Sequence, residues 1–245
     1  MAEFKIPTET VTLPSKGLLY PKDHPLASGK IEMKYMTAKE EDILSNGTYI
    51  SDGSVIDRVL KALVVTEFNW NDLLIGDKNA IMVAARVLGY GKDYTFTYNN
   101  KEHTVDLSKI EDKEIDENLY LSGNNFTFTL PHSGNVVVYK LLTNGDETKI
   151  SNELKGLKKI NKDNVPEATT RLKYMIQSVE GESDRKVVRD FVDNYLLARD
   201  ARALRENIQE TQPDVDLTFF PEDGAKRVSV PIGIKFFWPD VELGS

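Results

Sequence analysis

The spacing of apolar residues changes repeatedly along this chain, and these changes restrict the fold more than any other feature. Residues 37–90 and 146–212 carry apolar side chains at helical spacing. The stretches between and after them alternate apolar and polar residues around turn-forming residues, which is typical of β-hairpins. Separate helical and hairpin regions predict an α+β fold in which helical subdomains lie beside small antiparallel sheets.

The same changes divide the chain into regions that we expect to pack as one compact unit. They are an extended N-terminal segment (1–36), a helical subdomain (37–90), a β-hairpin region (91–145), a second helical subdomain (146–212), and a C-terminal hairpin with an aromatic tail (213–245). Thr37 and Glu40 are predicted to form a capping box, in which each side chain satisfies a free amide at the helix start. No internal repeat is expected.

The chain has 245 residues and no cysteine. This length suffices for one large or two small domains. The lack of cysteine excludes disulfides, thiolate zinc sites, iron–sulfur clusters and cysteine nucleophiles, and it suits a reducing cytosol. Neither an apolar signal region nor a run of about 18 apolar residues occurs, so we expect neither secretion nor membrane insertion.

The formal net charge is −8, which argues against a broad nucleic-acid-binding surface. The charges are nevertheless unevenly distributed. Residues 106–117 contain six acids and two bases, whereas residues 155–173 contain six bases and two acids. Two interpretations remain open: solvated helix faces, or an acidic and a basic patch that orient a partner.

The sequence contains no glycine-rich phosphate loop and no GxSxG nucleophile motif. His24, His103 and His132 lie in separate loops or hairpins without metal-ligand spacing. The paired carboxylates at 40–41 and 222–223 are expected in exposed caps and turns. The sequence therefore predicts no enzyme, cofactor, metal or small-molecule substrate. An uncharacterised cytosolic enzyme is the remote alternative.

Two segments are candidates for contact with a protein partner. In residues 13–17, a proline stiffens the chain and a glycine permits a sharp turn, which suits a structural bend or a strand offered to a partner's sheet edge. The aromatic run 236–238 is either core or an interface anchor. The candidate partner-binding residues are Leu13, Pro14, Lys16, Tyr20, Phe236, Phe237 and Trp238.

Several short segments, in order along the chain, carry a resemblance to a known family. They are LPSKGLLY (13–20), MTAKEEDIL (36–44), LIGDKNA (74–80), ARVLGYG (85–91), KLLT (140–143), ARDARALR (198–205) and FFWPD (236–240). Together they resemble the baseplate hub assembly proteins of T-even-type and related tailed phages. The resemblance implies tail morphogenesis and not catalysis.

The resemblance also implies partners and a location. The chain would act as a chaperone that covers sheet edges and apolar helices of hub or tape-measure subunits before they assemble. The alternative is a structural subunit retained in the virion baseplate. The expected location is the host cytoplasm during assembly, or the virion tail baseplate, with neither nucleic acid nor membrane as a partner.

The chain departs from the family pattern at two turns. Relatives carry cysteine pairs of a small zinc ribbon where this sequence has residues 98–101 and 220–224. The resemblance therefore implies a degenerate, zinc-ribbon-like pair of hairpins that is held by packing and binds no metal. A nucleic-acid binder descended from a zinc ribbon is a further alternative, against which the net charge and the missing ligands argue.

Overall fold

The computed structural model describes residues 5–160, 165–221 and 226–237 and confirms the α+β prediction. The helices are α1 (Ala38–Leu44), α2 (Gly47–Asp52), α3 (Val55–Leu63), α4 (Ile75–Tyr90), α5 (Asn144–Ile160), α6 (Glu167–Met175), α7 (Arg185–Asn194), α8 (Ala198–Thr211) and α9 (Ile234–Phe237). Short 3₁₀ helices are η1 (Pro25–Ser28), η2 (Trp70–Asp72), η3 (Leu107–Lys109) and η4 (Glu117–Tyr120).

The strands form small antiparallel sheets. They are β1 (Thr8–Thr12), β2 (Lys30–Lys34), β3 (Asp93–Tyr98), β4 (Lys101–Asp106), β5 (Phe126–Thr129), β6 (Val136–Tyr139), β7 (Ile176–Val179), β8 (Thr218–Phe219) and β9 (Val228–Ser229). The sheet orders are β1-β2, β3-β4, β5-β6-β7 and β8-β9. The expected hairpins around residues 99–102 and 131–135 are thereby confirmed.

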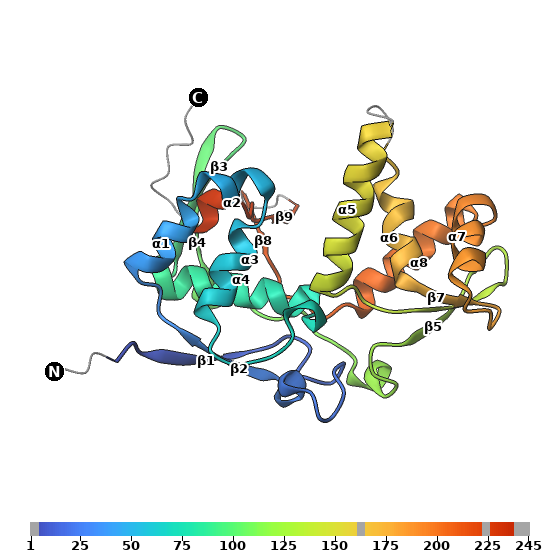
Figure 1. Ribbon diagram of the computed structural model, residues 1–245, viewed down its shortest axis with the longest axis horizontal. Helices are drawn as coiled ribbons and strands as arrows, with labels where there is room; N and C mark the ends of the chain where they lie inside the picture. The colour runs from blue at the N-terminus through green and yellow to red at the C-terminus, as the bar shows by residue number, and fades with distance from the viewer. Residues whose placement is uncertain (1–4, 161–164, 222–225, 238–245) are drawn as a thin grey trace.

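The elements form two lobes side by side (Figure 1). The first lobe contains β1, β2 and α1 to α4, and the second contains β5 to β7 and α5 to α8. After α8 the chain returns to the first lobe, where an isolated bridge pairs Asp112 with Val215. There the hairpins β3-β4 and β8-β9 pack together, with the rings of Phe96 and Phe219 4.9 Å apart.

The two lobes repeat one structural unit, so the expectation of no internal repeat is wrong. Each unit begins with a strand followed by a Leu-Pro-x-x-Gly turn, at 13–17 and at 130–134. The turn glycines, Gly17 and Gly134, have φ angles of 78° and 75°. In each turn the leucine amide donates across the hairpin at 2.9 Å, to residue 29 in one lobe and residue 135 in the other.

The helix-to-strand transition later in each unit also repeats closely. Helices α3 and α6 both have nine residues and end at a residue of extended conformation. These end residues, Val64 and Ile176, have φ and ψ of −75° and 125°, and of −69° and 124°. Each then pairs antiparallel with the second strand of its own lobe, Val64 with Met33 and Ile176 with Tyr139. Helix α3 therefore corresponds to α6, and α4 corresponds to α8.

One buried core extends through both units. Met33 and Tyr139 occupy matching positions in β2 and β6, and their side chains are almost fully buried. Ile81 and Leu204 likewise match on the inward faces of α4 and α8. In the described ranges, no helix has the length and apolar character needed to cross a membrane.

Candidate functional site

A fully buried carboxylate holds the segment that the sequence marked as a contact candidate. Asp77 lies in the first turn of α4 and accepts hydrogen bonds from the Ser15 amide at 2.9 Å, the Ser15 hydroxyl at 2.7 Å and the Tyr20 hydroxyl at 2.7 Å. Burial raises the pKa of the Asp77 carboxyl and that of the Tyr20 hydroxyl. Residues 13–20 therefore form a bend clamped onto α4, the structural one of the two interpretations.

Two glycines allow this bend to close on itself. Gly17 and Gly29 both have positive φ angles, 78° and 68°. A Cβ on Gly17 would lie 2.4 Å from the Ala27 carbonyl oxygen, and one on Gly29 would lie 2.7 Å from the Lys16 carbonyl. Both positions therefore need glycine, for the backbone angle and for the space.

The second lobe repeats the clamp without the long loop. Asp200, buried at the start of α8, accepts from the His132 amide at 2.8 Å and from the Ser133 amide at 3.0 Å. Burial alone would raise the pKa of the Asp200 carboxyl, but these hydrogen bonds outweigh it and lower the pKa. The two matching aspartates thus differ in the direction of their pKa shift.

A third buried acid, in the first lobe, closes the start of α1. Glu40 accepts from the Lys34 ammonium at 2.8 Å, the Thr37 amide at 3.0 Å and the Thr37 hydroxyl at 2.7 Å. Burial opposes ionisation, but these hydrogen bonds and the Lys34 charge lower the pKa of Glu40 to about 2. The predicted capping box is confirmed. The expectation that Glu40 is exposed is wrong, because its carboxylate is buried against Lys34 and Thr37.

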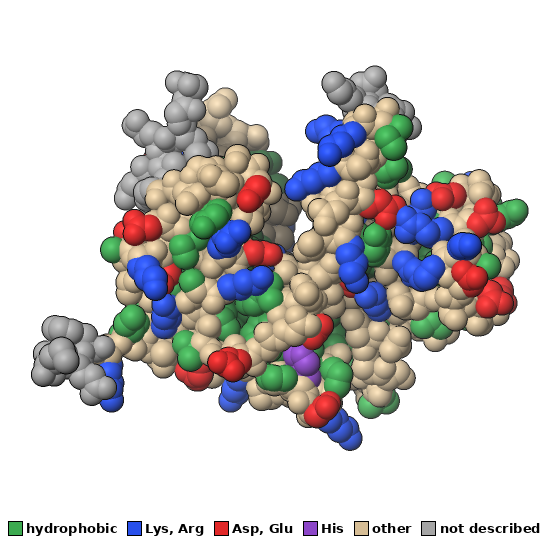
Figure 2. All heavy atoms as spheres, viewed as in Figure 1, with side chains coloured by type: hydrophobic (Ala, Val, Ile, Leu, Met, Phe, Trp, Pro, Cys, Tyr) green, Lys and Arg blue, Asp and Glu red, His purple; other side chains and the backbone are tan. Residues whose placement is uncertain are grey.

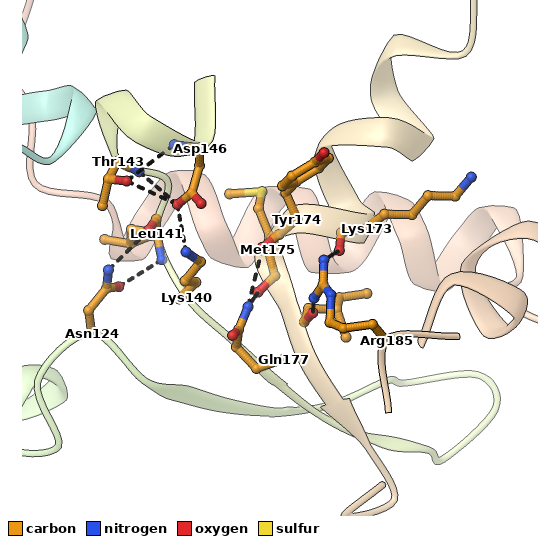
Figure 3. Close-up of polar contacts among 11 residues, drawn as sticks. Asn124, Lys140, Leu141, Thr143, Asp146, Lys173, Tyr174, Met175, Gln177 and Arg185 are labelled. Carbon is orange, nitrogen blue, oxygen red and sulfur yellow. Dashed lines mark hydrogen bonds and ion pairs between the residues drawn. The ribbon is translucent and has the colours of Figure 1, made fainter. Parts of the chain in front are cut away.

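Figure 3 shows the matching arrangement at the start of α5. Asp146 accepts from the Lys140 ammonium at 2.6 Å, the Thr143 hydroxyl at 3.1 Å and the Thr143 amide at 3.2 Å. The amide side chain of Asn124 clamps the end of β6, because it donates to the Leu141 carbonyl at 3.0 Å and accepts from the Leu141 amide at 2.7 Å. In the first lobe, the matching Tyr35 amide instead donates to the Pro7 carbonyl at 3.2 Å.

The same close-up shows how α7 is fixed to the end of α6 (Figure 3). The Arg185 guanidinium donates to the carbonyls of Lys173 at 2.7 Å and Ile176 at 3.1 Å. Gln177 donates to the Met175 carbonyl at 3.2 Å. These contacts satisfy carbonyl groups at a helix C-terminus and so stabilise the transition from helix to strand.

The buried acids therefore serve the architecture. Each of the four carboxylates named above accepts hydrogen bonds from the chain's own turns and helix starts. Among residues 5–160, 165–221 and 226–237, no group of three or more His, Asp or Glu side chains lies close enough to hold a metal ion. These hydrogen bonds stabilise the turns and helix starts of the two similar lobes.

The lobes meet where α4 and α5 begin, at a contact we call the lobe joint. It consists of residues 73–75 of the first lobe and 142–144 of the second, linked by an isolated antiparallel bridge. The Asn144 amide donates to the carbonyl of residue 73 at 2.8 Å, and the Ile75 amide donates to the carbonyl of residue 142 at 3.2 Å. Leu73 and Leu74 are buried there.

A polar cleft of about 500 Å³ lies beside the lobe joint, lined by α3, α4 and α5 (Figure 2). At its edge the Lys78 ammonium contacts the Asp57 carboxylate at 2.5 Å and the Asn144 side chain at 2.6 Å. A Cβ on Gly145 would lie 2.9 Å from the Asn71 Cβ, so glycine permits this close approach. These groups bind the lobes to each other.

The charge patches expected from the sequence are present only in part. Figure 2 shows Lys and Arg side chains gathered over the second lobe. Exposed lysines follow the outer turns of α5, namely Lys155, Lys158 and Lys159. In the acidic stretch, by contrast, Asp106 pairs with Lys92 at 3.0 Å and Glu117 pairs with Lys16 at 2.6 Å. In the basic stretch, only these three lysines form an exposed patch, because Lys173 is buried and pairs with Asp193 at 2.6 Å and Arg171 pairs with Glu147 and Glu167. Ion pairs therefore partly neutralise both stretches, and residue 162 lies outside the described residues.

The structure revises the candidate contact surface. Side chains buried in this fold are Leu13, Pro14, Tyr20, Phe236 and Phe237. Phe236 packs edge-to-face on Tyr94 with ring centroids 4.9 Å apart, so this part of the tail docks into the first lobe. Lys16 is exposed, and Trp238 lies outside the described residues.

Sequence reasoning missed an apolar surface beside Lys16. The ion pair between Lys16 and Glu117 joins the clamped bend to η4. On these two segments Leu18, Leu119 and Leu121 are 40%, 50% and 87% exposed, and we call them the leucine surface. The sequence has leucines at 18, 119 and 121 beside polar turns, but whether such leucines are exposed depends on tertiary packing.

Comparison of the chain with protein-family models, with curated proteins and with solved structures finds no match.

Proposed function

We propose that this protein is a non-enzymatic phage tail morphogenesis protein that acts as a chaperone in assembly of the baseplate hub. The segments that resemble the family support this proposal, because most of them form the buried clamps and helix caps that recur in both lobes. Residues 13–20 and 74–80 are joined by the Asp77 clamp. Residues 36–44 and 140–143 form the two helix caps, and 198–205 carries Asp200.

The observation that carries the proposal is the leucine surface. Its three leucines have exposed side chains on two segments that the Lys16–Glu117 ion pair joins, and apolar side chains exposed near one another are typical of a protein contact. Its base is rigid, since the bend beneath it is clamped by Asp77 and closed by two glycines. A preorganised apolar surface of this kind can cover an exposed helix or sheet edge of an unassembled hub or tape-measure subunit.

The packed hairpins support descent from a ribbon-bearing family. The aromatic side chains of β3, β4 and β8 pack together beside the two turns that carry the cysteine pairs in the family pattern, and residues 222–224 of the second turn lie outside the described residues. The ring of Phe219 lies 4.9 Å from Phe96, 5.9 Å from Tyr98 and 5.2 Å from His103. In this proposal aromatic packing replaces the metal, so the hairpins need no zinc.

The mutational test is replacement of Leu121 by aspartate. The Leu121→Asp variant should fold, fail to restore plaques to a phage that lacks the protein, and lose the hub or tape-measure subunit that co-purifies with the wild type. Ile160→Asp is the matched control, since its side chain is 85% exposed on the far lobe. Equal complementation by both variants and the wild type would refute the role of the leucine surface.

A structural subunit retained in the baseplate is the alternative function. Quantitative mass spectrometry of purified particles and of infected-cell lysate separates the two. Abundance in lysate with none in particles supports the chaperone. A fixed number of copies per particle identifies a baseplate subunit and rejects the chaperone.

A further inference from the structure

The lobe joint is a contact between unlike ends of two similar units. Residues 73–75, just before α4 in the first unit, bind residues 142–144, at the start of α5 in the second. By the correspondence of the units, residues 196–198 before α8 match 73–75, and residues 36–38 before α1 match 142–144. Within one chain these two matching segments have no counterpart, so each lobe leaves one half of a joint unused.

Exposure and hydrogen bonding agree with two unused halves. Leu197 is 50% exposed, whereas its match Leu74 is 3% exposed. The Leu196 carbonyl and the amides of Ala38 and Ala198 have no hydrogen-bond partner among the described residues. In the lobe joint, the matching groups are those that bond across the lobes.

The two halves lie at opposite ends of the molecule. Helix α1 lies toward one end of the long axis and α7, which leads into residues 196–198, lies toward the other (Figure 1). The two segments of one chain therefore cannot meet each other. We propose that copies of this protein associate head to tail, with residues 196–198 of one copy pairing with residues 36–38 of the next as in the lobe joint.

Charge complementarity supports a second copy as the occupant. In the cleft beside the lobe joint, Asn79 and Met82 of α4 and Glu147 and Thr148 of α5 line the same cavity. The matching residues are two arginines on α8 and two acids on α1. These are Arg202, Arg205, Glu41 and Asp42. Because Arg202 already pairs with Glu206 within α8 at 2.8 Å, the exposed Arg205 is the cation that would face the anionic pair between copies, which favours this partner and fixes its orientation.

The joint between copies differs from the lobe joint in one respect. Lys39 stands where Gly145 does, and a Cβ at Gly145 already approaches Asn71 at 2.9 Å. The contact between copies must therefore open slightly, so it is weaker than the lobe joint and depends on concentration. Because it is heterologous, it generates a closed ring or a filament and not a symmetric dimer.

Cysteine cross-linking tests the proposal directly, because the chain contains no cysteine of its own. The Ala38→Cys/Leu197→Cys double variant of the full chain should form a ladder or a discrete ring on oxidation. Mixing the two single variants should give dimers only, and Leu197→Cys alone should give none. Ala38→Cys/Leu121→Cys is the control and should remain monomeric. Equal cross-linking in variant and control, or none in either, would overturn the proposal.

A second measurement needs no cysteine. Sedimentation of the wild type over a wide concentration range should show association that high salt weakens. Arg205→Glu should abolish it, and adding Asp42→Arg in the same chain should restore it, because each joint then regains opposite charges. A wild type that stays monomeric at every concentration, or a double variant no better than Arg205→Glu, would reject the model.

Discussion

Replacement of Glu40 by glutamine tests whether the buried caps stabilise the fold as the geometry indicates. The pKa of Glu40 falls from its usual 4.5 to about 2, because hydrogen bonds from Lys34 and Thr37 outweigh the cost of burial. One pKa unit corresponds to about 1.4 kcal/mol, so a shift of this size means that the ionised carboxylate contributes roughly 3 kcal/mol to folding near neutral pH. Glu40→Gln should lose about that amount.

The pH dependence gives the sharper criterion. A carboxyl whose folded pKa is lowered stabilises the protein above its unfolded pKa, and that contribution disappears as the pH falls from 4.5 toward 2. In urea unfolding followed by tryptophan fluorescence, the difference between wild type and Glu40→Gln should be full at pH 7 and shrink through this window. Asp42→Asn, an exposed change on the same helix, is the control. A difference that stays constant down to pH 2 would refute the reasoning.

Three further predictions concern packing, the matched aspartates and metal. Gly76→Ala places a Cβ 1.8 Å from the Pro213 carbonyl oxygen and should cost roughly 3 kcal/mol or more in thermal unfolding, whereas Gly156→Ala, with nothing within 4 Å, should be neutral or stabilising. Burial raises the pKa of Asp77, so acidification should raise the stability of the wild type relative to Asp77→Asn. The pKa of Asp200 is lowered, so acidification should lower the stability of the wild type relative to Asp200→Asn. Chelator or added zinc should leave the melting temperature unchanged, and a shift of several degrees would contradict packing without metal.

Local sequence signals predicted local structure well. The capping box at Thr37 and the hairpin of β3 and β4 are both present. Errors arose where tertiary contacts set the boundaries. Asp77 is of a residue type that favours helix N-caps, but it lies inside the first turn of α4 because Ile75 is already held by the lobe joint. The third hairpin pairs only at residues 218–219 and 228–229, in a region packed on β3 and β4.

Core and interface could not be separated from sequence at the aromatic tail. Phe236 and Phe237 are buried because Tyr94 and α4 provide a surface for them, and these elements lie far away in the chain. The same reasoning applies to Tyr20. Its hydroxyl donates to Asp77 and accepts from the Leu74 amide at 3.0 Å, and no local sequence pattern predicts these partners. Leu121 shows the opposite case: its side chain is exposed in the fold, and no local pattern in the sequence predicts that exposure.

The repeat escaped detection because unequal insertions separate its conserved positions. The first turn is followed by a long loop that the second lacks, and α7 has no equal in the first lobe, which has η2 there. The recurring residues are few. They are the Leu-Pro-x-x-Gly turn, a lysine, a threonine and an acid spaced three apart, and the Leu-Leu pair three residues before a buried aspartate. Hydrogen bonds, and not overall similarity, reveal the correspondence.

The repeat also changes how the exposed end of the second lobe should be interpreted. Proteins built from stacked units that remain monomeric carry polar outer faces on their terminal units. Here the terminal face instead presents Tyr195 at 64% and Leu197 at 50% exposure, next to the Ala198 amide, which has no hydrogen-bond partner in the part of the chain that the structure describes. The first lobe buries the matching leucine against the second lobe, so burial at this position follows from the presence of a next unit. A second copy supplies that unit through the same backbone pairing as the lobe joint, which is why we favour head-to-tail association over a monomer.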